Sequence, residues 1–458
     1  MLETLNNWII SANDWIWTYL LIILLILIGL YFTFKSRFVQ FRYFGEMFRL
    51  LGQGVSNGKG KNSVSSFQAF CIATASRVGT GNLAGVATAV ALGGSGAVFW
   101  MWVLALIGSA SAFVESTLAQ IYKEKGERSF IGGPAFYIGK GLKKKGLALL
   151  FAFIIIITFG LVFNSVQANT IAIAFHEIYG TGQLGPAIIL TFFTLITIFG
   201  GIHRIARVAG IIVPFMAIAY ILVALFILFN HMTAIPALIG HIFSNAFGIE
   251  QVVGGGLGAT IMQGVRRGLF SNEAGMGSAP NAAATHPVKQ GLIQALSVFT
   301  DTIVICSCTA FIILLSDLPL DGTLKGIQLT QAAVGHEIGP FGAQFIAFCI
   351  LLFAFSSIVG NYSYCETNLF FISRHPAGLQ IYRIAVGGMV RFGSRFGHRL
   401  ESGRPIYGPH DPDQPDRPHL SWSFSFKSPK KLQRSKTPGY QKPGIQSQRY
   451  PGNRRPTF

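Results

Sequence analysis

The chain has 458 residues, of which 51% are apolar and only 12% are charged, and its formal net charge is +18. Soluble domains carry about 25% charged residues, so this composition excludes an ordinary soluble enzyme. Together with 53 glycines it favours a membrane protein with closely packed helices. The positive charge is concentrated at one end, because residues 374–458 hold 16 Lys and Arg against 4 Asp and Glu.

A membrane-spanning helix needs roughly 20 mostly apolar residues, and several stretches of the chain meet that requirement. They are 16–34, 96–121, 147–175, 184–201, 208–230, 291–316 and 341–372. Two further stretches, 65–91 and 252–274, are apolar but interrupted by glycines and polar residues, and another helix begins at 382–394. The sequence thus predicts an all-α polytopic membrane protein.

The distribution of Lys and Arg predicts the orientation, because positive loops stay on the cytoplasmic side of a membrane. Residues 1–14 contain no Lys or Arg, whereas 35–61 and 122–145 are rich in them. Three other loops contain a single such residue, Lys325: 176–184, 231–250 and 317–340. These counts place the N-terminus outside. All the Lys- and Arg-rich loops then fall on the cytoplasmic side only if both interrupted stretches cross the membrane.

The two interrupted stretches are the most informative parts of the sequence. The first contains Arg77-Val-Gly-Thr-Gly-Asn-Leu-Ala-Gly85, and the second runs from Gly254 to Glu273. Apart from the first helix, they are segments one and six of ten, which predicts a five-plus-five inverted repeat with a broken helix in each half. Such breaks can bind a carboxylate and a cation through free N–H groups and carbonyls. Close helix packing through Gly81-x-x-x-Gly85 is the alternative interpretation.

Several long runs of residues around these breaks carry a resemblance to one family. They are 65–89, Gly93-Gly-Ser-Gly-Ala-Val-Phe-Trp-Met-Trp102, Asn164-Ser-Val-Gln-Ala-Asn169, Arg267-Gly-Leu-Phe-Ser-Asn-Glu-Ala-Gly-Met-Gly-Ser-Ala-Pro280, Asp301-Thr302 and 353–366. Over roughly residues 15–394 the chain resembles the alanine or glycine:cation symporter family. The resemblance implies sodium-coupled uptake of small amino acids by a leucine-transporter-like fold with one extra N-terminal helix.

The resemblance also implies which residues bind the substrate. Thr80-Gly81-Asn82 would hold the substrate backbone, since free N–H groups at a break accept a carboxylate and an Asn amide serves either substrate or cation. Gln167 is expected to reach the substrate through its amide, with a hydrogen bond between helices as the alternative. Phe270 is expected to form a wall of the pocket that favours a small side chain. Two residues beside it complete the predicted substrate site: Ser271 and Asn272.

Sodium prefers hard oxygen ligands, and fold analogy places one sodium site between the first broken helix and the long stretch 341–372. The candidate ligands there lie in the region Thr74–Val78, with Thr74 nominated, and at Ser356 and Ser357. A second cation near the substrate would use Asn82, Thr260 and Asp301. Asp301 is an ionisable residue inside an apolar helix, which predicts a functional role, although a structural pairing is the alternative. Glu115 beside Arg77 is expected to be a buried ion pair.

Other functions fit the sequence less well. A proton-coupled amino-acid permease is the nearest alternative, because Asp301 and Glu366 are acidic. A channel would need a continuous polar pore, and the basic tail shows no folded nucleic-acid-binding motif. No metal-binding or redox spacing of Cys or His indicates an enzyme, and the cysteines predict small buried side chains. The expected partners are therefore a small amino acid, sodium as the coupling ion and a lipid bilayer, with no other cofactor and no nucleic acid.

The family pattern stops near residue 395. We expect residues 1–394 to form the transmembrane symporter domain and residues 395–458 to be a basic, proline-rich tail, either frameshifted or disordered. A frameshift would remove the last core helix and leave a transporter without function. The expected location is the inner, or plasma, membrane of a bacterium.

Overall fold

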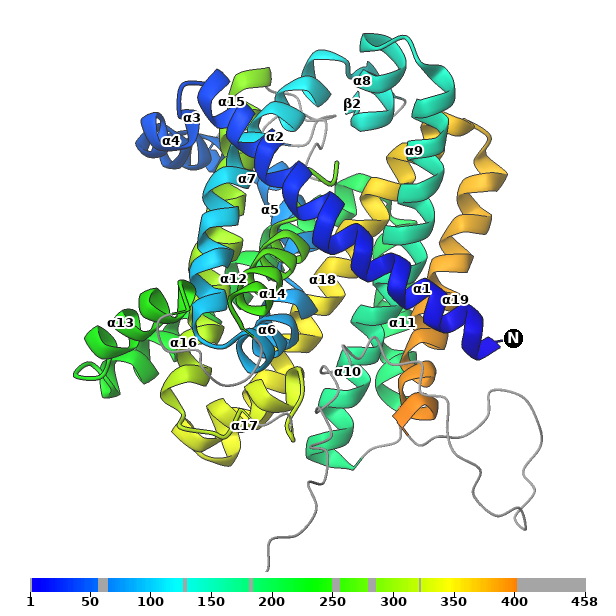
Figure 1. Ribbon diagram of the computed structural model, residues 1–458. Helices are drawn as coiled ribbons and strands as arrows, with labels where there is room; N and C mark the ends of the chain where they lie inside the picture. Colours follow the sequence, from blue (N-terminus) through cyan, green and yellow to red (C-terminus); the bar gives the residue numbers. More distant parts are fainter. Residues whose placement is uncertain are drawn as a thin grey trace, which may run out of the picture.

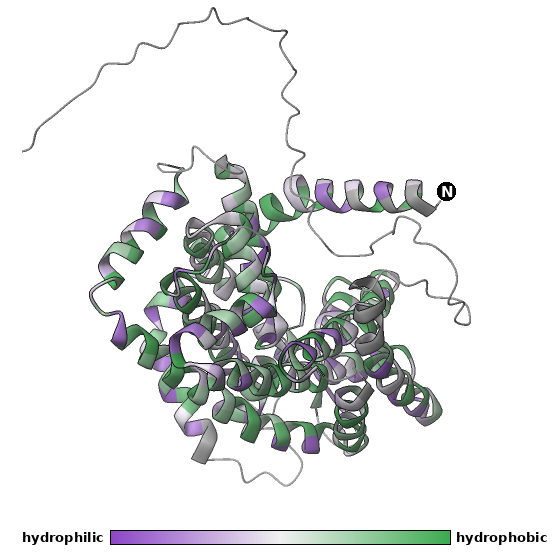
Figure 2. Cartoon of the chain, turned by 90° about the horizontal axis from the view of Figure 1, so that it is seen from below, coloured by the Kyte–Doolittle hydropathy of each residue, from purple (hydrophilic) through white to green (hydrophobic). Residues whose placement is uncertain are grey.

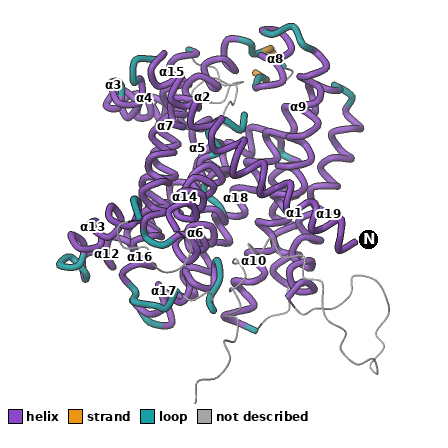
Figure 3. The backbone as a smooth tube through the Cα atoms, viewed as in Figure 1, coloured by secondary structure: helices purple, strands orange, loops and turns teal. Residues whose placement is uncertain are grey.

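The computed structural model describes residues 2–56, 65–126, 130–180, 184–248, 256–278, 286–320 and 323–401. Helices make up almost all of this part of the chain (Figures 1 and 3). The strands β1 (Glu124–Lys125) and β2 (Phe130–Ile131) form a short antiparallel pair in which Glu124 lies opposite Ile131. The predicted tail lies outside the described residues beyond 401.

The first half of the chain contains three long apolar helical stretches, and two of them include a wide π-helical segment, labelled η. Their bounds and those of the shorter helices between them are α1 (Leu2–Trp15), η1 (Ile16–Leu21), α2 (Ile22–Lys35), α3 (Val39–Arg42), α4 (Phe44–Ser56), α5 (Ser66–Arg77), η2 (Gly81–Gly85), α6 (Val86–Gly93), α7 (Gly96–Ile121), α8 (Pro134–Gly141), α9 (Lys145–Ile157), η3 (Thr158–Phe163), α10 (Asn164–Tyr179) and α11 (Leu184–Phe199). Ser65 starts α5 with a capping box, because its hydroxyl accepts from the Gln68 N–H at 3.1 Å while Gln68 Oε1 accepts from the Ser65 N–H at 3.0 Å.

The second half contains three more long apolar helical stretches. Its elements are α12 (Gly201–Asn230), α13 (Ile235–Ala246), α14 (Gly256–Asn272), α15 (Pro287–Val298), η4 (Phe299–Cys306), α16 (Ser307–Leu315), α17 (Ile327–Ile338), α18 (Pro340–Ile372) and α19 (Pro376–Glu401). Proline at the first turn of α13, α15 and α18 is favourable there, because that N–H has no helical partner. The last helix, α19, continues past residue 394, the predicted end of the membrane domain.

Among the described residues, six helical stretches are long and apolar enough to cross a membrane, and they confirm the prediction of an all-helical polytopic membrane protein. They are Asn7–Lys35, Gly96–Ile121, Lys145–Tyr179, Gly201–Asn230, Pro287–Leu315 and Pro340–Ile372. Apolar residues line these helices (Figure 2), and many large apolar side chains on their outer faces are exposed, including Phe215 and Leu222 on α12. A membrane accounts for such faces, because lipid tails are as apolar as these side chains.

The helices pack into two neighbouring groups. In one, α7 lies against α2, α14 and α15, while α6 packs on α14 and α16. In the other, α10 packs on α18 and α19, and α11 packs on α19. Helix α5 joins the groups by packing on both α15 and α18. Most of the predicted site residues lie where these groups meet, and Thr260 is the exception.

Candidate functional site

The first interrupted stretch is a broken helix. Helix α5 ends at Arg77, Val78 is extended with φ −77° and ψ 93°, and η2 begins at Gly81. The Val78 N–H still bonds the Thr74 carbonyl at 2.8 Å. The break therefore places the end of α5, with its last carbonyls, against the start of η2, with its first N–H groups.

Two side chains bond the backbone at this break. The Gly79 N–H donates to Asn82 Oδ1 at 2.9 Å, and the Thr80 N–H donates to Gln167 Oε1 at 3.0 Å. A Cβ at Gly79 would collide with the Ser357 hydroxyl and would lie 2.9 Å from Gln167 Nε2. The Gln167 side chain thus reaches from α10 to the break. Only glycine at position 79 leaves room for the side chains of α10 and α18 to approach the broken backbone so closely.

A buried carboxylate lies beside the break. Asp301 Oδ1 accepts a hydrogen bond from Asn82 Nδ2 at 2.6 Å, and Asp301 Oδ2 accepts from the Ser271 hydroxyl at 2.6 Å and the Thr302 hydroxyl at 2.9 Å. Cys306 Sγ completes the group at 3.1 Å from Ser271 Oγ and 3.3 Å from Asn82 Nδ2. All five side chains are fully buried. In the described part of the chain, no Lys or Arg forms an ion pair with this carboxylate.

The second interrupted stretch breaks at its end instead of its middle. Helix α14 runs without a break through its glycines to Asn272. Glu273 then takes a left-handed conformation with φ 52°, and Gly275 and Gly277 follow with φ of 87° and 81°. Asn272 Oδ1 accepts the Ala274 N–H at 3.0 Å, which stabilises this turn, and its amide donates to Thr302 at 3.2 Å. Residues 279–285, which follow this turn, lie outside the described part of the chain.

Phe270, on the last turn of α14, closes one side of the break. A Cβ at Gly81 would lie 3.2 Å from its ring, and the ring packs on Phe163 with centroids 5.2 Å apart. The Arg267 guanidinium lies 5.8 Å from the ring centroid. A larger residue at position 81 would therefore press on Phe270.

The oxygen atoms predicted to hold sodium lie on the other side of the break. The Ser356 hydroxyl lies 3.4 Å from the Ala75 carbonyl, and the Ser357 hydroxyl lies 3.2 Å from the Val78 carbonyl. The Thr74 hydroxyl is buried and has no hydrogen-bond partner among the residues that the structure describes. Hydroxyls of α18 and carbonyls at the end of α5 thus form one cluster of hard oxygens.

Thr260 is not brought together with the other predicted cation ligands. Its hydroxyl donates to the Gly93 carbonyl at 2.8 Å, at the far end of α6 from Asn82. Arg77 also differs from expectation. Its Nη1 donates to Ser297 Oγ and to the Gln294 carbonyl, while Nε and Nη2 have no partner, so the expected ion pair with Glu115 is not formed.

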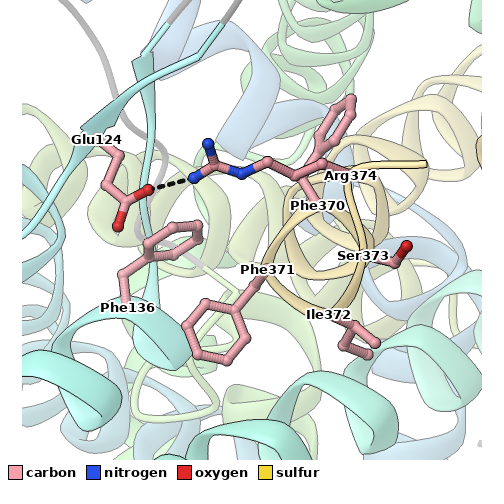
Figure 4. A pocket seen from close by; sticks show the side chains of 7 residues that line it. All are labelled: Glu124, Phe136, Phe370, Phe371, Ile372, Ser373 and Arg374. Carbon is pink, nitrogen blue, oxygen red and sulfur yellow. Dashed lines mark hydrogen bonds and ion pairs between the residues drawn. The ribbon is translucent and has the colours of Figure 1, made fainter. Parts of the chain in front are cut away.

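A surface cavity of about 300 Å³ lies elsewhere, at the end of α18 (Figure 4). It contains none of the predicted site residues, and its lining is Glu124, Phe136, Phe370, Phe371, Ile372, Ser373 and Arg374. Glu124 accepts from Lys140 at 2.9 Å and from Arg374 at 2.7 Å. The hydrogen bond from Lys140 and the two positive charges lower the pKa of Glu124. This contact ties the β1 hairpin to the end of α18.

Sequence reasoning missed two members of the central group. From the sequence, Thr302 belongs to a run that resembles the family and has no predicted role, and Cys306 is predicted only to be a small buried side chain. The available signal was their spacing from Asp301, because residues at i+1 and i+5 in a wide helical turn can converge on the same partner. Thr302 contacts Asp301 on its own helix and Asn272 of α14, whereas Cys306 contacts Ser271 and Asn82 on other helices.

A polytopic helical protein with a broken helix, a buried carboxylate held by neutral hydrogen-bond donors and a cluster of hard oxygens is a membrane transporter by class. The sequence model of the Sodium:alanine symporter family matches residues 2–400. The chain therefore belongs to this family of sodium-coupled amino-acid symporters, and it is a transporter instead of an enzyme.

Three curated relatives illustrate the range of the family. "Amino-acid carrier protein AlsT" of Bacillus subtilis (strain 168) is 55% identical over 399 residues, which cover 86% of this chain and 84% of the relative. "Probable sodium/glutamine symporter GlnT" of the same organism is 53% identical over 397 residues, or 86% and 83% of the two chains. "Sodium/proton-dependent alanine carrier protein" of Bacillus sp. (strain PS3) is 40% identical over 346 residues, or 72% and 77%.

Proposed function

We propose that this protein imports small neutral amino acids, alanine and glycine above all, together with sodium. The observation that carries the proposal is Asp301, a fully buried carboxylate that accepts three neutral hydrogen bonds beside a broken helix. Neutral donors stabilise a carboxylate without cancelling its charge. A negative charge without an ion-pair partner in a membrane interior is costly, and the nearby Arg77 is shared with Glu273 and Glu115, so the site favours a bound cation.

The substrate carboxylate would bind at the Thr80-Gly81-Asn82 break. Its oxygens would replace Asn82 Oδ1 and Gln167 Oε1 as acceptors for the Gly79 and Thr80 N–H groups. The freed amides of Asn82 and Gln167 would then contact the substrate directly. Phe270, with Ser271 and Asn272 behind it, would limit the room for the substrate side chain.

Two positions would hold sodium. One is the hard-oxygen cluster of Thr74, the Ala75 and Val78 carbonyls, Ser356 and Ser357. The other is Asp301 with the Asn82 side chain, close to the proposed substrate carboxylate. Thr260 would contribute only if α6 and α14 rearranged, since its hydroxyl bonds Gly93.

The mechanism would be alternating access in a five-plus-five inverted repeat. The packing supports it, because the group around α7, α14 and α15 meets the group around α10, α18 and α19 through α5. One group would rock against the other and open the central site to each side in turn. Sodium would favour the state that binds substrate, and substrate would favour sodium binding to the same degree.

The relatives' names leave two substrates to compare, since one is named for alanine and one for glutamine. The close contact between Gly81 and Phe270 favours the smaller. We place the protein in the plasma membrane of a bacterium, as its bacterial relatives suggest, with the N-terminus outside. We further propose that residues 395–458 are not native to the transporter, which resequencing the gene and translating the other frames would test. If no other frame encodes an apolar helix, the frameshift is rejected.

The test of function is uptake by purified protein in liposomes. Labelled alanine, glycine, serine and glutamine are offered with an inward sodium gradient, with an equal potassium gradient, and with an inward proton gradient alone. The proposal predicts saturable accumulation of alanine and glycine with sodium only. Accumulation driven by protons without sodium would support the permease instead, and flux without accumulation would support a channel.

A further inference from the structure

A row of hydrogen-bonded side chains crosses the core where four elements meet. It begins at Glu273 in the turn after α14 and continues through Ser76 on α5, Asn361 on α18 and Asn164 at the start of α10. All four side chains are at most 3% exposed. The row is distinct from the Asp301 group, and the transport mechanism above does not use it.

The direction of each hydrogen bond is fixed from one end. Asn164 lies 3.0 Å from the Gly160 carbonyl, and a carbonyl only accepts, so the amide nitrogen of Asn164 faces Gly160. The oxygen of Asn164 therefore faces Asn361, whose amide nitrogen donates to it at 3.0 Å. Asn361 Oδ1 is left facing Ser76 Oγ at 2.5 Å. Only the Ser76 hydroxyl can supply the hydrogen for that bond.

The single hydrogen of Ser76 is thus used by Asn361. Toward Glu273, the Ser76 oxygen can only accept, and the Glu273 carboxyl oxygens lie 3.4 Å and 3.5 Å from it. At Ser76 an ionised carboxylate would face another acceptor in a buried site, which is unfavourable, and its remaining hydroxyl contact is with Ser278 in the same turn. A protonated carboxyl would donate to Ser76 and complete the row. We infer that Glu273 binds a proton in this conformation, and that this position is a proton-binding site of the transporter.

The charged groups around Glu273 agree with a bound proton. The charge of Arg77 on α5 favours the ionised form of Glu273, whereas the charge of Asp301 on η4 favours the protonated form. Glu115 of α7 bonds the backbone of Gly275 and Gly277 in the same turn. Beyond Glu115 lies Tyr137 of α8, while α18 and α10 contribute the two asparagine amides of the row. Three carboxylates thus share a single arginine. A proton on Glu273 removes one negative charge from this membrane interior.

The row also connects proton binding to conformation. Helices α5 and α18 touch at Ser76, because a Cβ at Gly360 would lie 2.7 Å from the Ser76 nitrogen. If α5 moves away from α18, the Ser76–Asn361 bond breaks and the Ser76 hydroxyl becomes free to donate to Glu273. The Glu273 O–H bond would then break, its proton would pass to water, and the carboxylate would accept from Ser76. Low pH should therefore favour the conformation described here, and high pH the separated one.

Infrared spectroscopy of the purified full chain tests the site without transport. A buried protonated carboxyl gives a C=O stretching band that disappears as the pH is raised. We expect this band in the wild type, its absence in Glu273→Gln, and its retention in the control Glu337→Gln, a buried glutamate that contacts His231 at 2.7 Å. The same band in wild type and Glu273→Gln would overturn the inference.

A second variant covers the case in which Glu273→Gln fails to fold. Asn361→Ala releases the Ser76 hydroxyl, which can then donate to an ionised Glu273. The proton should bind more weakly, so the band should disappear at a lower pH than in the wild type. An unchanged titration would also overturn the inference.

The role in transport rests on the proposed function and is tested separately. In sodium-driven uptake, one bound proton changes the apparent substrate affinity by at most about tenfold per pH unit, and Glu273→Gln should flatten that dependence. If sodium-driven uptake is absent in the wild type, the proposed function fails while the infrared result still decides the proton site. If uptake is sodium-driven and Glu273→Gln keeps the wild-type pH profile, the role in transport is rejected.

Discussion

Asp301 and Glu366 are both buried carboxylates in apolar helices, but their surroundings differ. Glu366 on α18 accepts from Arg383 of α19 at 3.3 Å, and the same guanidinium donates to the Tyr362 hydroxyl at 2.9 Å and covers the Phe199 ring. Asp301 accepts from an amide and two hydroxyls. The protein thus pairs Glu366 directly with a cation, whereas the hydrogen-bond partners of Asp301 are all neutral and Arg77 acts on it only without a direct contact.

The difference separates a structural charge from a functional one. A carboxylate paired with arginine holds two helices together and has little need of another ion. A carboxylate surrounded by neutral donors keeps its charge and can attract a mobile cation. Substitutions at Asp301, Asn82, Arg383 and Glu124 test this contrast, and their expected effect on uptake decreases in that order.

Asp301→Asn should have the largest effect. The variant removes the charge and turns one of the two acceptor oxygens into an amide nitrogen, and each bond to a charged group contributes about 1.5–3 kcal/mol, so sodium-driven uptake should fall by about 100-fold or more. The measurement is initial uptake rate against sodium concentration in liposomes. Asp317→Asn, at an exposed loop position, is the matched control and should keep the wild-type rate. Sodium activation that is unchanged in Asp301→Asn would refute the cation role.

Asn82→Ala should have the next largest effect. It removes a donor to Asp301 and the acceptor for the Gly79 N–H, and a bond to a charged group is worth about 1.5–3 kcal/mol. We expect the KM for alanine to rise by roughly 10- to 100-fold. Asn245→Ala removes an amide that bonds Ser95 on the outer part of the protein and serves as control. Normal uptake by Asn82→Ala would remove this residue from the site.

Arg383→Met should damage stability more than function. It leaves Glu366 buried without its cation, and breaking such a pair costs about 3–5 kcal/mol. The thermal unfolding midpoint of the purified protein should therefore fall clearly, while the KM of the folded fraction stays near the wild-type value. A large rise in KM with an unchanged midpoint would show that the Glu366 pair also belongs to the transport site.

Glu124→Gln should have the smallest effect. Contact with Lys140 and Arg374 lowers the pKa of Glu124 in the folded protein, so its stabilising contribution is present above the ordinary Glu pKa and is lost as the pH falls through the lowered value. An exposed pair contributes about 0–1 kcal/mol. Unfolding midpoints of wild type and variant should differ slightly at neutral pH and converge in acid or high salt. A difference that grows in acid would contradict this assignment.

The sequence predicted the spanning helices and the first break, because apolar length and glycine interruptions are local features. The ends of α7 and α18 match the prediction within a residue or two, whereas α12 begins earlier because His203, Arg204 and Arg207 continue the helix before its apolar part. Helices α13 and α17 are not predicted by the sequence, because each has only 12 residues and lies in a connection between spanning helices.

The partners within the site could not be read from the sequence. Asn82 meets Ser271, Asp301 and Cys306, which lie 189, 219 and 224 residues away. Helical periodicity shows which face is buried, but it does not show which buried polar groups face one another. Thr260 illustrates this. It lies in the second glycine-rich stretch, where a cation ligand is predicted, but its hydroxyl bonds the Gly93 carbonyl at the other end of α6. The conformation of Glu273 likewise depends on the turn after α14.

The most direct test is the flux of radioactive sodium driven by an amino-acid gradient. Liposomes containing the wild type or Asp301→Asn are given equal sodium on both sides and an inward gradient of alanine. We predict that alanine drives sodium inward through the wild type and that Asp301→Asn abolishes this flux. Sodium movement that does not respond to alanine in the wild type, or that persists in Asp301→Asn, would contradict a carboxylate that binds the coupling ion.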